Sequence, residues 1–449
     1  MTSAPPAPPA PPAPPPAGPP RADVRVRLAW EHTHRELLPA LILLNGLEKR
    51  GIPYALEHVT ALRACAPGPE VVFLPFYYDE SDFDRYLFRG GFERRWIVNL
   101  AYEQMHFLCG RPYLLPDGPF AREHMLHCAW GERFRELLRA HGVPDERIRV
   151  VGHPRFDLYH RPELLLGRAA LAARYGLDPD RRWLLVPYNF NLAYVTRALV
   201  ARLQARGYAL TEPFIDGVRR ARDAFTALVR TLCDRFPDHE VILRVHPAGY
   251  EAETIYKDEA RARPNLRLIA HYDIANWITQ AALTIVWNST SAMEAMAAGR
   301  AVVSYEPEPF SETFDYDVNR IVPTFRSVDE VVDVVRAGEG APLRYDWPRF
   351  ERWYRWRDGR CAERLCDVVR EAQEGYEQFR ARAARAGGWR GRWRRRAEAL
   401  AAPLPAAVAP AIRGALGLAS RAQGGGPPAA ALAAAVSALS PAPLDGFLK

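Results

Sequence analysis

The sequence predicts an α/β protein with two lobes, each built on a parallel β-sheet. Short β-prone runs alternate with helix-forming runs along both halves of the chain, and this alternation favours parallel strand order. Polar side chains follow several of the predicted strands directly, at the points where the strands end. With 449 residues, the chain is long enough for two or three domains, each with its own core.

The composition is that of a globular protein without a disulfide framework. Hydrophobic residues make up 48% of the chain and charged residues 25%, and the six cysteines form no Cys-x-x-Cys pair. We find neither a secretory signal nor an apolar stretch long enough to span a membrane, and we therefore expect a cytoplasmic protein. We predict no cofactor and no bound metal ion.

The net charge of +7 is concentrated in one segment. Residues 379–396 contain eight arginines and no acid, so the remainder of the chain is close to neutral. This distribution does not predict a general nucleic-acid-binding surface. We expect residues 1–21 to be disordered, because they form a Pro/Ala tract that holds eleven of the forty prolines.

The first lobe is predicted over residues 22–155. A strand over Val24–Trp30 alternates apolar and charged residues, and an amphipathic helix follows over His34–Arg50. Glu31 and His34 lie at this junction, at the carboxyl end of a strand, where ligands bind in open α/β sheets. The alternative is a solvated helix start whose acids suit the helix dipole.

Glu103 follows the strand predicted at Arg95–Leu100 and thus has the same topological position as Glu31. We predict that Glu31 is a general base of the first lobe, with Glu103 or His34 as substitutes. His124 and His127 have helical spacing but no distant partner pair, so core or surface histidines are favoured over a metal site.

The second lobe is predicted over residues 156–345. Its strands are expected at Trp183–Pro187, Glu240–Val245, Leu266–Ile269, Ala281–Trp287 and Ala301–Tyr305.

Polar residues gather after these strands. Asn189 follows the first, Arg244 and His246 end the second, and 288–291 follow the fourth. Because parallel order brings the carboxyl ends of strands to one edge, we expect these side chains to converge. An arginine fork and an imidazole beside a helix amino end suit a diphosphate, although Arg244 could also be an ordinary strand residue.

The turn and helix at 288–299 have two interpretations. Ser291 and Glu294 fit a capping box, and Gly299 fits the C′ position, so a well-capped helix accounts for all three. It does not account for Asn288, Ser289 and Thr290, which are predicted to donate to a phosphate. Glu294 would accept hydrogen bonds from a ribose if the cap did not occupy it.

The C-terminal part is predicted to contain a helix over 346–386 that crosses back to the first lobe, and then a tail over 387–449. The tail begins with tryptophans and arginines that suit the interface of an anionic membrane: Trp389, Arg392, Trp393, Arg394, Arg395 and Arg396. Nucleic acid or a merely solvated tail are the alternatives for this segment alone.

Four stretches carry a family resemblance. They are EHTHRELLPALILLNGLEKRGI at 31–52, WGERFRELLRAHGVPDERIRVVGHPRFDLY at 130–159, VILRVHPAGY at 241–250 and WNSTSAMEA at 287–295. In order and spacing the chain resembles the bacterial surface carbohydrate biosynthesis family. That family is related to CDP-glycerol glycerophosphotransferases and capsule glycosyltransferases.

The resemblance implies two Rossmann-like lobes of the GT-B type, an N-terminal acceptor lobe and a C-terminal nucleotide-donor lobe. It places Arg155 and Asp157 in the element that joins the lobes. The chain departs from the family pattern at His153, where asparagine is commoner, and at 99–103, which lacks an acidic run.

The implied function is a metal-independent transfer of a sugar or polyol phosphate in surface polysaccharide biosynthesis. The donor would be nucleotide-activated, the acceptor lipid- or glycan-linked, and nucleic acid is not expected as a partner. Two alternatives stay open: a nucleotide-sugar 2-epimerase of the same fold, and a non-catalytic polysaccharide assembly protein.

Overall fold

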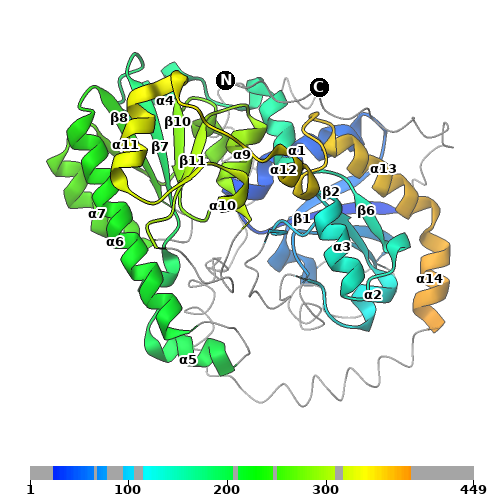
Figure 1. The fold of residues 1–449 in the computed structure, drawn as a ribbon. Coiled ribbons are helices and arrows are strands. Elements are labelled where there is room, and N and C mark those ends of the chain that lie inside the picture. The colour runs from blue at the N-terminus through cyan, green and yellow to red at the C-terminus, as the bar shows by residue number, and fades with distance from the viewer. Residues whose placement is uncertain are drawn as a thin grey trace.

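The computed structural model describes residues 24–64, 68–77, 95–105, 115–205, 211–245, 250–308 and 317–385. Within them the chain forms two six-stranded sheets, each flanked by helices, in two lobes that lie side by side (Figure 1). The strand pairs in both sheets are parallel, for example β1 with β3 and β7 with β8. The predicted two-lobed α/β fold is therefore confirmed.

The first sheet has the strand order β2-β1-β3-β4-β5-β6. Its strands are β1 (Arg25–Trp30), β2 (Tyr54–His58), β3 (Glu70–Leu74), β4 (Arg95–Asn99), β5 (Leu126–Ala129) and β6 (Ile148–Val150). Its helices are α1 (Thr33–Glu48), α2 (Pro119–His124) and α3 (Glu132–Ala140), and the short 3-10 helix η5 (Asp145–Arg147) precedes β6.

One local prediction in this lobe is wrong. The helical spacing assumed for His124 and His127 does not exist, because His124 ends α2 and His127 lies in β5. His127 is fully buried and its Nε2 lies 2.8 Å from the carbonyl oxygen of Ala121. Burial lowers the pKa of His127 to about 4, as suits a neutral core histidine.

The second sheet has the order β12-β11-β10-β7-β8-β9. Its strands are β7 (Arg182–Tyr188), β8 (His239–Val245), β9 (Leu266–Ile269), β10 (Leu283–Val286), β11 (Val302–Tyr305) and β12 (Thr324–Phe325). Its helices are α4 (Arg168–Tyr175), α5 (Arg197–Ala205), α6 (Glu212–Arg235), α7 (Tyr250–Ala262), α8 (Ile274–Ile278), α9 (Ser291–Ala297), α10 (Val318–Ile321) and α11 (Val328–Ala337).

Both faces of the second sheet are buried, as parallel sheets require. Along β7, Leu184 and Val186 pack into the cluster that contains α6 and α11, and Trp183 and Leu185 pack into the opposite cluster. This two-sided burial explains why the strand is a continuous apolar run rather than an alternating one.

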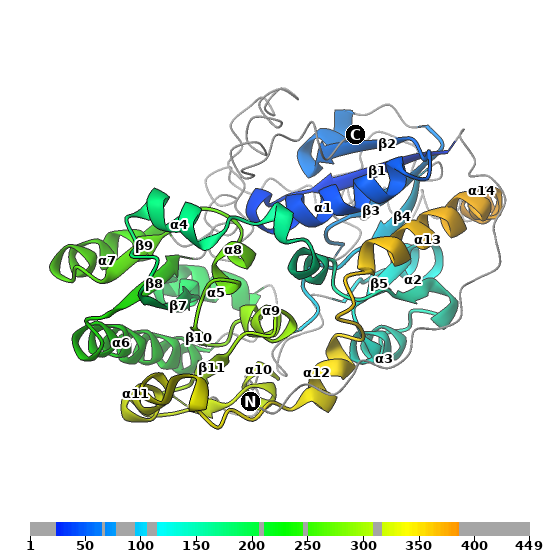
Figure 2. The same cartoon turned by 90° about the horizontal axis from the view of Figure 1, so that it is seen from above.

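The crossing helix predicted over 346–386 is divided into three helices: α12 (Trp347–Trp353), α13 (Cys361–Glu374) and α14 (Tyr376–Arg385). They carry the chain from the second lobe back to the first, where α13 packs beside α1 (Figure 2). The Gln373 amide donates to the carbonyl oxygen of Val24, 2.7 Å away, so α13 is joined to the residue that directly precedes β1.

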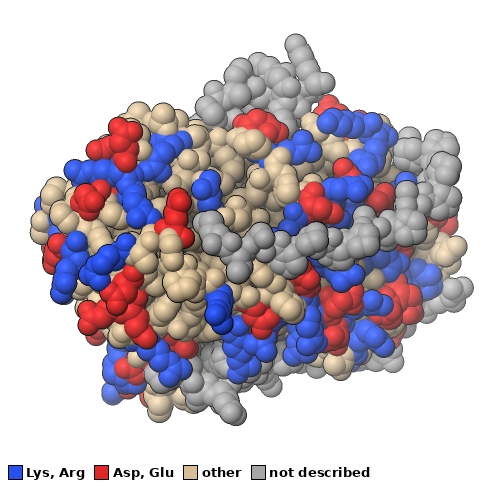
Figure 3. All heavy atoms as spheres, turned by 45° about the horizontal axis from the view of Figure 1, so that its top comes forward, with Lys and Arg blue, Asp and Glu red and all other residues tan. Residues whose placement is uncertain are grey.

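Several predictions lie outside the described residues. They concern the leader at 1–21, His246 and the tail with Trp389, Arg392, Trp393, Arg394, Arg395 and Arg396, as well as the side chain of His34. In the part of the chain that the structure does describe, no helix is both long and apolar enough to cross a membrane. On the face shown in Figure 3, basic and acidic side chains are interspersed.

Candidate functional site

The candidate site starts at the carboxyl ends of the second sheet. Asn189 follows β7 and Asn288 follows β10, and these strands are neighbours in the sheet. The Asn189 amide donates to the carbonyl oxygen of Asn288 at 3.2 Å. The structure thus brings together two of the predicted phosphate-binding residues.

Asn288 has a left-handed backbone with φ of 42°, a conformation that asparagine tolerates better than most residues. Its side chain is buried, and its Oδ1 accepts a hydrogen bond from Asn319 at 2.7 Å. Its Nδ2 is buried and has no hydrogen-bond partner among the described residues. Because buried amide groups are nearly always paired, this donor is a candidate for ligand binding.

Asn319 fixes the orientation of that amide. It donates to Asn288 and to Glu306 Oε1 at 3.0 Å, and its Oδ1 accepts from the Ser304 hydroxyl at 2.7 Å. Sequence reasoning missed Asn319 and Glu306. Glu306 could have been found, since it directly follows β11, whereas Asn319 carries no local signal.

The predicted capping box of α9 is wrong. The residue before the helix is Thr290, which has helical backbone angles and makes no side-chain cap, and Ser291 is the first helical residue. The Ser291 hydroxyl pairs instead with the Ser289 hydroxyl at 2.7 Å. Gly299 does end the helix, with φ of 66° and the paired backbone bonds of a Schellman motif.

Glu294 turns away from the cap toward the junction of the lobes. Its Oε2 accepts from Arg155 Nε and Nη2, at 3.0 and 2.8 Å, and from the Tyr159 hydroxyl at 2.7 Å. Three protein donors therefore occupy one of the two carboxylate oxygens of Glu294. Glu294 binds Arg155, 139 residues away in sequence, instead of forming the predicted capping box. Local spacing cannot reveal such a distant partner.

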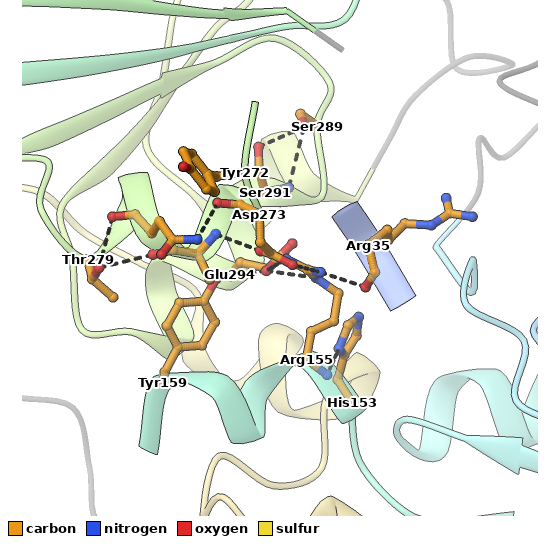
Figure 4. A network of polar contacts seen from close by, with 12 residues as sticks. Arg35, His153, Arg155, Tyr159, Tyr272, Asp273, Thr279, Ser289, Ser291 and Glu294 are labelled. Atoms are coloured by element: carbon orange, nitrogen blue, oxygen red, sulfur yellow. Dashed lines mark hydrogen bonds and ion pairs between the residues drawn. The ribbon is translucent and has the colours of Figure 1, made fainter. Parts of the chain in front are cut away.

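Arg155 is the centre of the interlobe network (Figure 4). It lies in the 3-10 helix η6 (Pro154–His160), is 4% exposed, and holds both Asp273 oxygens at 2.6 and 2.8 Å. Its Nη1 also donates to the carbonyl oxygen of Arg35 on α1, at 2.7 Å. Burial opposes the charge, but the Asp273 and Glu294 carboxylates outweigh it and raise the pKa of Arg155 well above its usual value.

Asp157 lies two residues after Arg155 and binds the backbone at the start of a C-terminal helix. Its carboxylate accepts from the backbone N–H groups of Cys361 and Ala362, at 3.0 and 2.8 Å, at the start of α13. Burial raises the pKa of Asp157, and these two donors oppose the shift. Both residues assigned to the lobe junction thus bind other elements, Arg155 across the lobes and Asp157 to the C-terminal helices.

Arg244 is at the carboxyl end of β8 and only 5% exposed. Its Nη2 donates to the carbonyl oxygen of Tyr272, but its Nε and Nη1 are buried without a hydrogen-bond partner among the described residues. Burial lowers the pKa of Arg244 to about 10, the Arg155 charge adds to this effect, and Asp273 opposes it. A buried guanidinium with unused donors is costly, which points to a bound anion.

In the first lobe, Glu31 and Glu103 have different surroundings. Glu31 is 8% exposed, and its backbone N–H donates to Glu36 Oε2 at 2.7 Å. Glu36 also accepts from the His32 N–H at 3.3 Å. Glu36 is therefore the acid that stabilises the amino end of α1. Sequence reasoning missed Glu36, although it lies in the same polar run.

Glu103 is more accessible, with 37% of its side chain exposed, and its Oε1 accepts from Arg35 Nη1 at 2.7 Å. The surrounding protein atoms still remove enough water to raise the pKa of Glu103; Arg35 opposes the shift, and the Glu36 and Glu294 carboxylates add to it. Since Glu294 belongs to the second lobe, Glu103 lies where the two lobes meet. Arg35, also missed from sequence, links Glu103 to the Arg155 network.

Within the described ranges, no group of three or more His, Cys, Asp or Glu residues is arranged to hold a metal ion. The polar groups of the site are instead arginines, amides, hydroxyls and carboxylates. Such a set can bind an anion with fixed donors and can take a proton from a hydroxyl.

No protein-family model matches the chain, and no curated protein matches it. Solved structures do. The structure of the wall teichoic acid polymerase TagF aligns with a TM-score of 0.51 at 11% identity, over 79% of this chain and 90% of that one. A TagF variant soaked with CDPG aligns with a TM-score of 0.50 at 12% identity, over 80% and 90%. A putative UDP-N-acetylglucosamine 2-epimerase from Listeria monocytogenes aligns with a TM-score of 0.48 at 14% identity, over 79% and 97%.

At these identities the likeness to TagF shows a shared fold. The chain therefore has the two-lobed GT-B-like fold that its sequence predicts.

Proposed function

We propose that the chain transfers a glycosyl or polyol-phosphate group from a nucleotide-activated donor to a lipid- or glycan-linked acceptor in surface polysaccharide biosynthesis. The observation that carries this proposal is a set of three buried nitrogens on the second lobe that have no hydrogen-bond partner among the described residues: Arg244 Nε, Arg244 Nη1 and Asn288 Nδ2. Arg244 ends β8 and Asn288 follows β10, and these two strands lie on either side of β7. Two strand spacings separate the axes of β8 and β10 by about 10 Å. The fold shared with a polymerase that was soaked with CDPG supports it.

In this proposal Arg244 and Asn288 hold the diphosphate of the donor. Negative charge grows on the diphosphate as the bond to the transferred group breaks, and fixed donors in a buried site stabilise that charge without reorganising. Ser289 and Thr290 are half-buried in the same turn and are proposed to add hydroxyl donors, with His246 a further phosphate ligand from its sequence position.

Glu103 is the base in this proposal, in place of Glu31. It is the more exposed of the two carboxylates, and its raised pKa brings it closer to the range in which a general base works well. It would accept the proton of the acceptor hydroxyl as that oxygen attacks the transferred group. We further propose that the reaction takes place in the cytoplasm, at the inner face of the membrane.

Nucleotide binding tests the proposal. Calorimetry or thermal shift with CDP, CMP, UDP and GDP should show binding of at least one nucleotide to the wild type. Arg244→Met should bind that nucleotide about 10- to 100-fold more weakly, because a hydrogen bond to a charged group contributes about 1.5–3 kcal/mol. Its melting temperature should stay the same or rise, because an apolar side chain replaces an under-bonded buried charge.

The matched control is Arg336→Met, since the Arg336 side chain is 59% exposed and, among the described residues, pairs with Asp333 on its own helix. This control should bind nucleotides as the wild type does. If Arg244→Met also bound every nucleotide with wild-type affinity, the donor site would be misplaced. Incubation with a bound nucleotide sugar then separates the alternatives: a transferase labels an acceptor, an epimerase releases free sugar, and an assembly protein binds no nucleotide.

A further inference from the structure

The guanidinium of Arg244 is held by one turn of the second lobe. In the sheet Arg244 pairs with Ile269, the last residue of β9, and the turn at 270–273 follows β9 directly. Within that turn the Tyr272 carbonyl oxygen accepts from Arg244 Nη2. The Nε and Nη1 of the same side chain have no hydrogen-bond partner among the described residues. The position of the Tyr272 carbonyl therefore determines where these two nitrogens point.

The backbone of this turn is strained. Tyr272 has φ of 64°, in the left-handed region that bulky residues rarely adopt. Among the described residues, the other non-glycine residues with a left-handed backbone are Ala101 and Asn288, which lie in the turns that carry Glu103 and Ser289. Such conformations persist only where the surrounding structure holds them, and they concentrate at functional sites. We therefore ask which contacts hold the turn at Tyr272.

Arg155 holds this turn from the segment that joins the lobes (Figure 4). Asp273 directly follows Tyr272, and its two carboxylate oxygens accept from Arg155 at 2.6 and 2.8 Å. The Asp273 carboxylate also caps α8, because its Oδ1 accepts from the Ala275 N–H at 2.8 Å. Both side chains of the ion pair are buried. A paired fork of this kind fixes geometry as well as adding energy, so Asp273 and the carbonyl before it have one orientation.

The same guanidinium contacts two other parts of the site. Its Nε and Nη2 donate to Glu294 on α9, the helix that follows the turn at 288–290. Its Nη1 donates to the carbonyl oxygen of Arg35, and the Arg35 side chain binds Glu103. Arg155 thus contacts the strained turn, the helix after the second turn, and the first lobe at once.

We propose that Arg155 is a positioning residue of the donor site: it holds the turn at Tyr272 and Asp273, and through that turn it orients Arg244 toward the diphosphate. The inference rests on the proposed function and deepens it, because it gives the lobe junction a part in donor binding. Arg155 itself makes no contact with the donor. The substitution Arg155→Lys keeps a positive charge between the carboxylates but loses the planar fork, so the turn should be held less firmly.

A double-mutant cycle with the full chain tests this. The probe is whichever of CDP, CMP, UDP and GDP the wild type binds most tightly, and calorimetry gives its Kd for the wild type, Arg155→Lys, Arg244→Met and the double variant. Arg155→Lys alone should bind the nucleotide about 10-fold more weakly, a coupling typical of side chains in one network. In the Arg244→Met background the same substitution should change Kd by less than about twofold, because the side chain that it positions is gone.

A second variant and a matched control accompany the cycle. Asp273→Asn keeps a good N-cap residue for α8 and leaves Arg155 its other partners, yet it breaks the paired fork; it should weaken nucleotide binding in the same way. The control Arg149→Lys makes the same substitution in another fork, since Arg149 on β6 binds both carboxylate oxygens of Glu371 on α13. It should bind the nucleotide within about twofold of the wild type.

Two results would overturn the inference while leaving the donor site in place. One is an equal loss from Arg155→Lys in the wild-type and Arg244→Met backgrounds, because the effect would then not pass through Arg244. The other is wild-type affinity in both Arg155→Lys and Asp273→Asn, with the loss confined to Arg244→Met. Wild-type affinity in Arg244→Met is a different outcome, which would overturn the proposed function and this inference with it.

Discussion

Glu103 is held by one arginine and faced by two other acids. Arg35 donates to it at 2.7 Å, while Glu36 and Glu294 repel its charge. Loss of water around the carboxylate is the main cause that raises the pKa of Glu103, the two acids add to it, and Arg35, which has other partners, opposes it. Arg35 also binds Glu36 Oε1, at 3.0 Å, and stacks over the Phe76 ring at 5.0 Å.

A pH profile checks whether Glu103 is the base. The base must be ionised, so kcat/KM should fall on the acidic side at a higher pH than an ordinary glutamate would give. Arg35 lowers the pKa of Glu103, so Arg35→Gln should move this acidic limb to still higher pH. Glu103→Gln should remove the limb and cost about 100-fold or more in rate, with nucleotide affinity kept.

Glu31→Gln is the companion variant. If Glu103 is the base, Glu31→Gln should keep most of its turnover and the same pH profile. A profile that Glu103→Gln leaves unchanged, together with a large loss in Glu31→Gln, would return the role to Glu31.

At the scale of elements, two helices with similar amino-terminal sequences begin differently. Ser327 and Glu330 form a true capping box at α11, with both reciprocal bonds present. Ser291 and Glu294 have the same three-residue spacing at α9 but form none, because Glu294 binds Arg155. The spacing is thus necessary for the box but does not decide between a local and a distant partner.

Unfolding experiments should separate these two serines. Ser327→Ala should lower the free energy of unfolding by about 1 kcal/mol through loss of a cap. Ser291→Ala should change it by less than half as much, because the gain in helix propensity offsets the lost hydroxyl pair. Urea titration of both variants measures this. An equal or larger loss in Ser291→Ala would show that α9 is capped after all.

Local patterns predicted most elements of the second lobe and missed others. The strand at Leu266–Ile269 agrees with its predicted bounds, because apolar runs between turns are set by neighbouring residues. The strands β2 and β5 were missed, since each is short and flanked by helical signals. The predicted helix over 346–386 breaks where Tyr354 takes an extended conformation and the Arg355 N–H bonds to Trp130.

Some residues of the candidate site were likewise predicted from sequence and others were missed. Asn189, Arg244 and Asn288 were predicted because parallel topology alone brings strand ends together. Arg35 and Asn319 were missed because their roles depend on which side chains meet across the fold, whereas Glu306 was overlooked although it directly follows a predicted strand. Those contacts are a property of tertiary packing.

At the scale of the whole molecule, Arg155 joins the two lobes through one side chain. It binds α1 of the first lobe through the Arg35 carbonyl, and Asp273 and Glu294 of the second. Asp273 is 3% exposed and Glu294 is 9% exposed, and among the described residues both carboxylates form their ion pairs with Arg155.

Removing Arg155 should be strongly destabilising. Arg155→Ala leaves two buried carboxylates without their cation and should cost about 3–5 kcal/mol in the free energy of unfolding, measured by urea titration. The control Arg352→Ala breaks an exposed pair between α12 and α3, with side chains 58% and 46% exposed, and should cost less than about 1 kcal/mol. Equal costs for the two variants would show that the buried pairs do not form.

The closure of the first lobe by the C-terminal helices sets an order for biosynthesis. The core cluster that begins at Val24 includes Phe379, whereas the cluster around α6 in the second lobe extends only to Leu343. A ribosome therefore makes the first lobe early but finishes its core only after the second lobe has emerged. Apolar surface of the first lobe therefore stays uncovered until its last helices have been made, and we expect the lobe that is synthesised first to complete its core last.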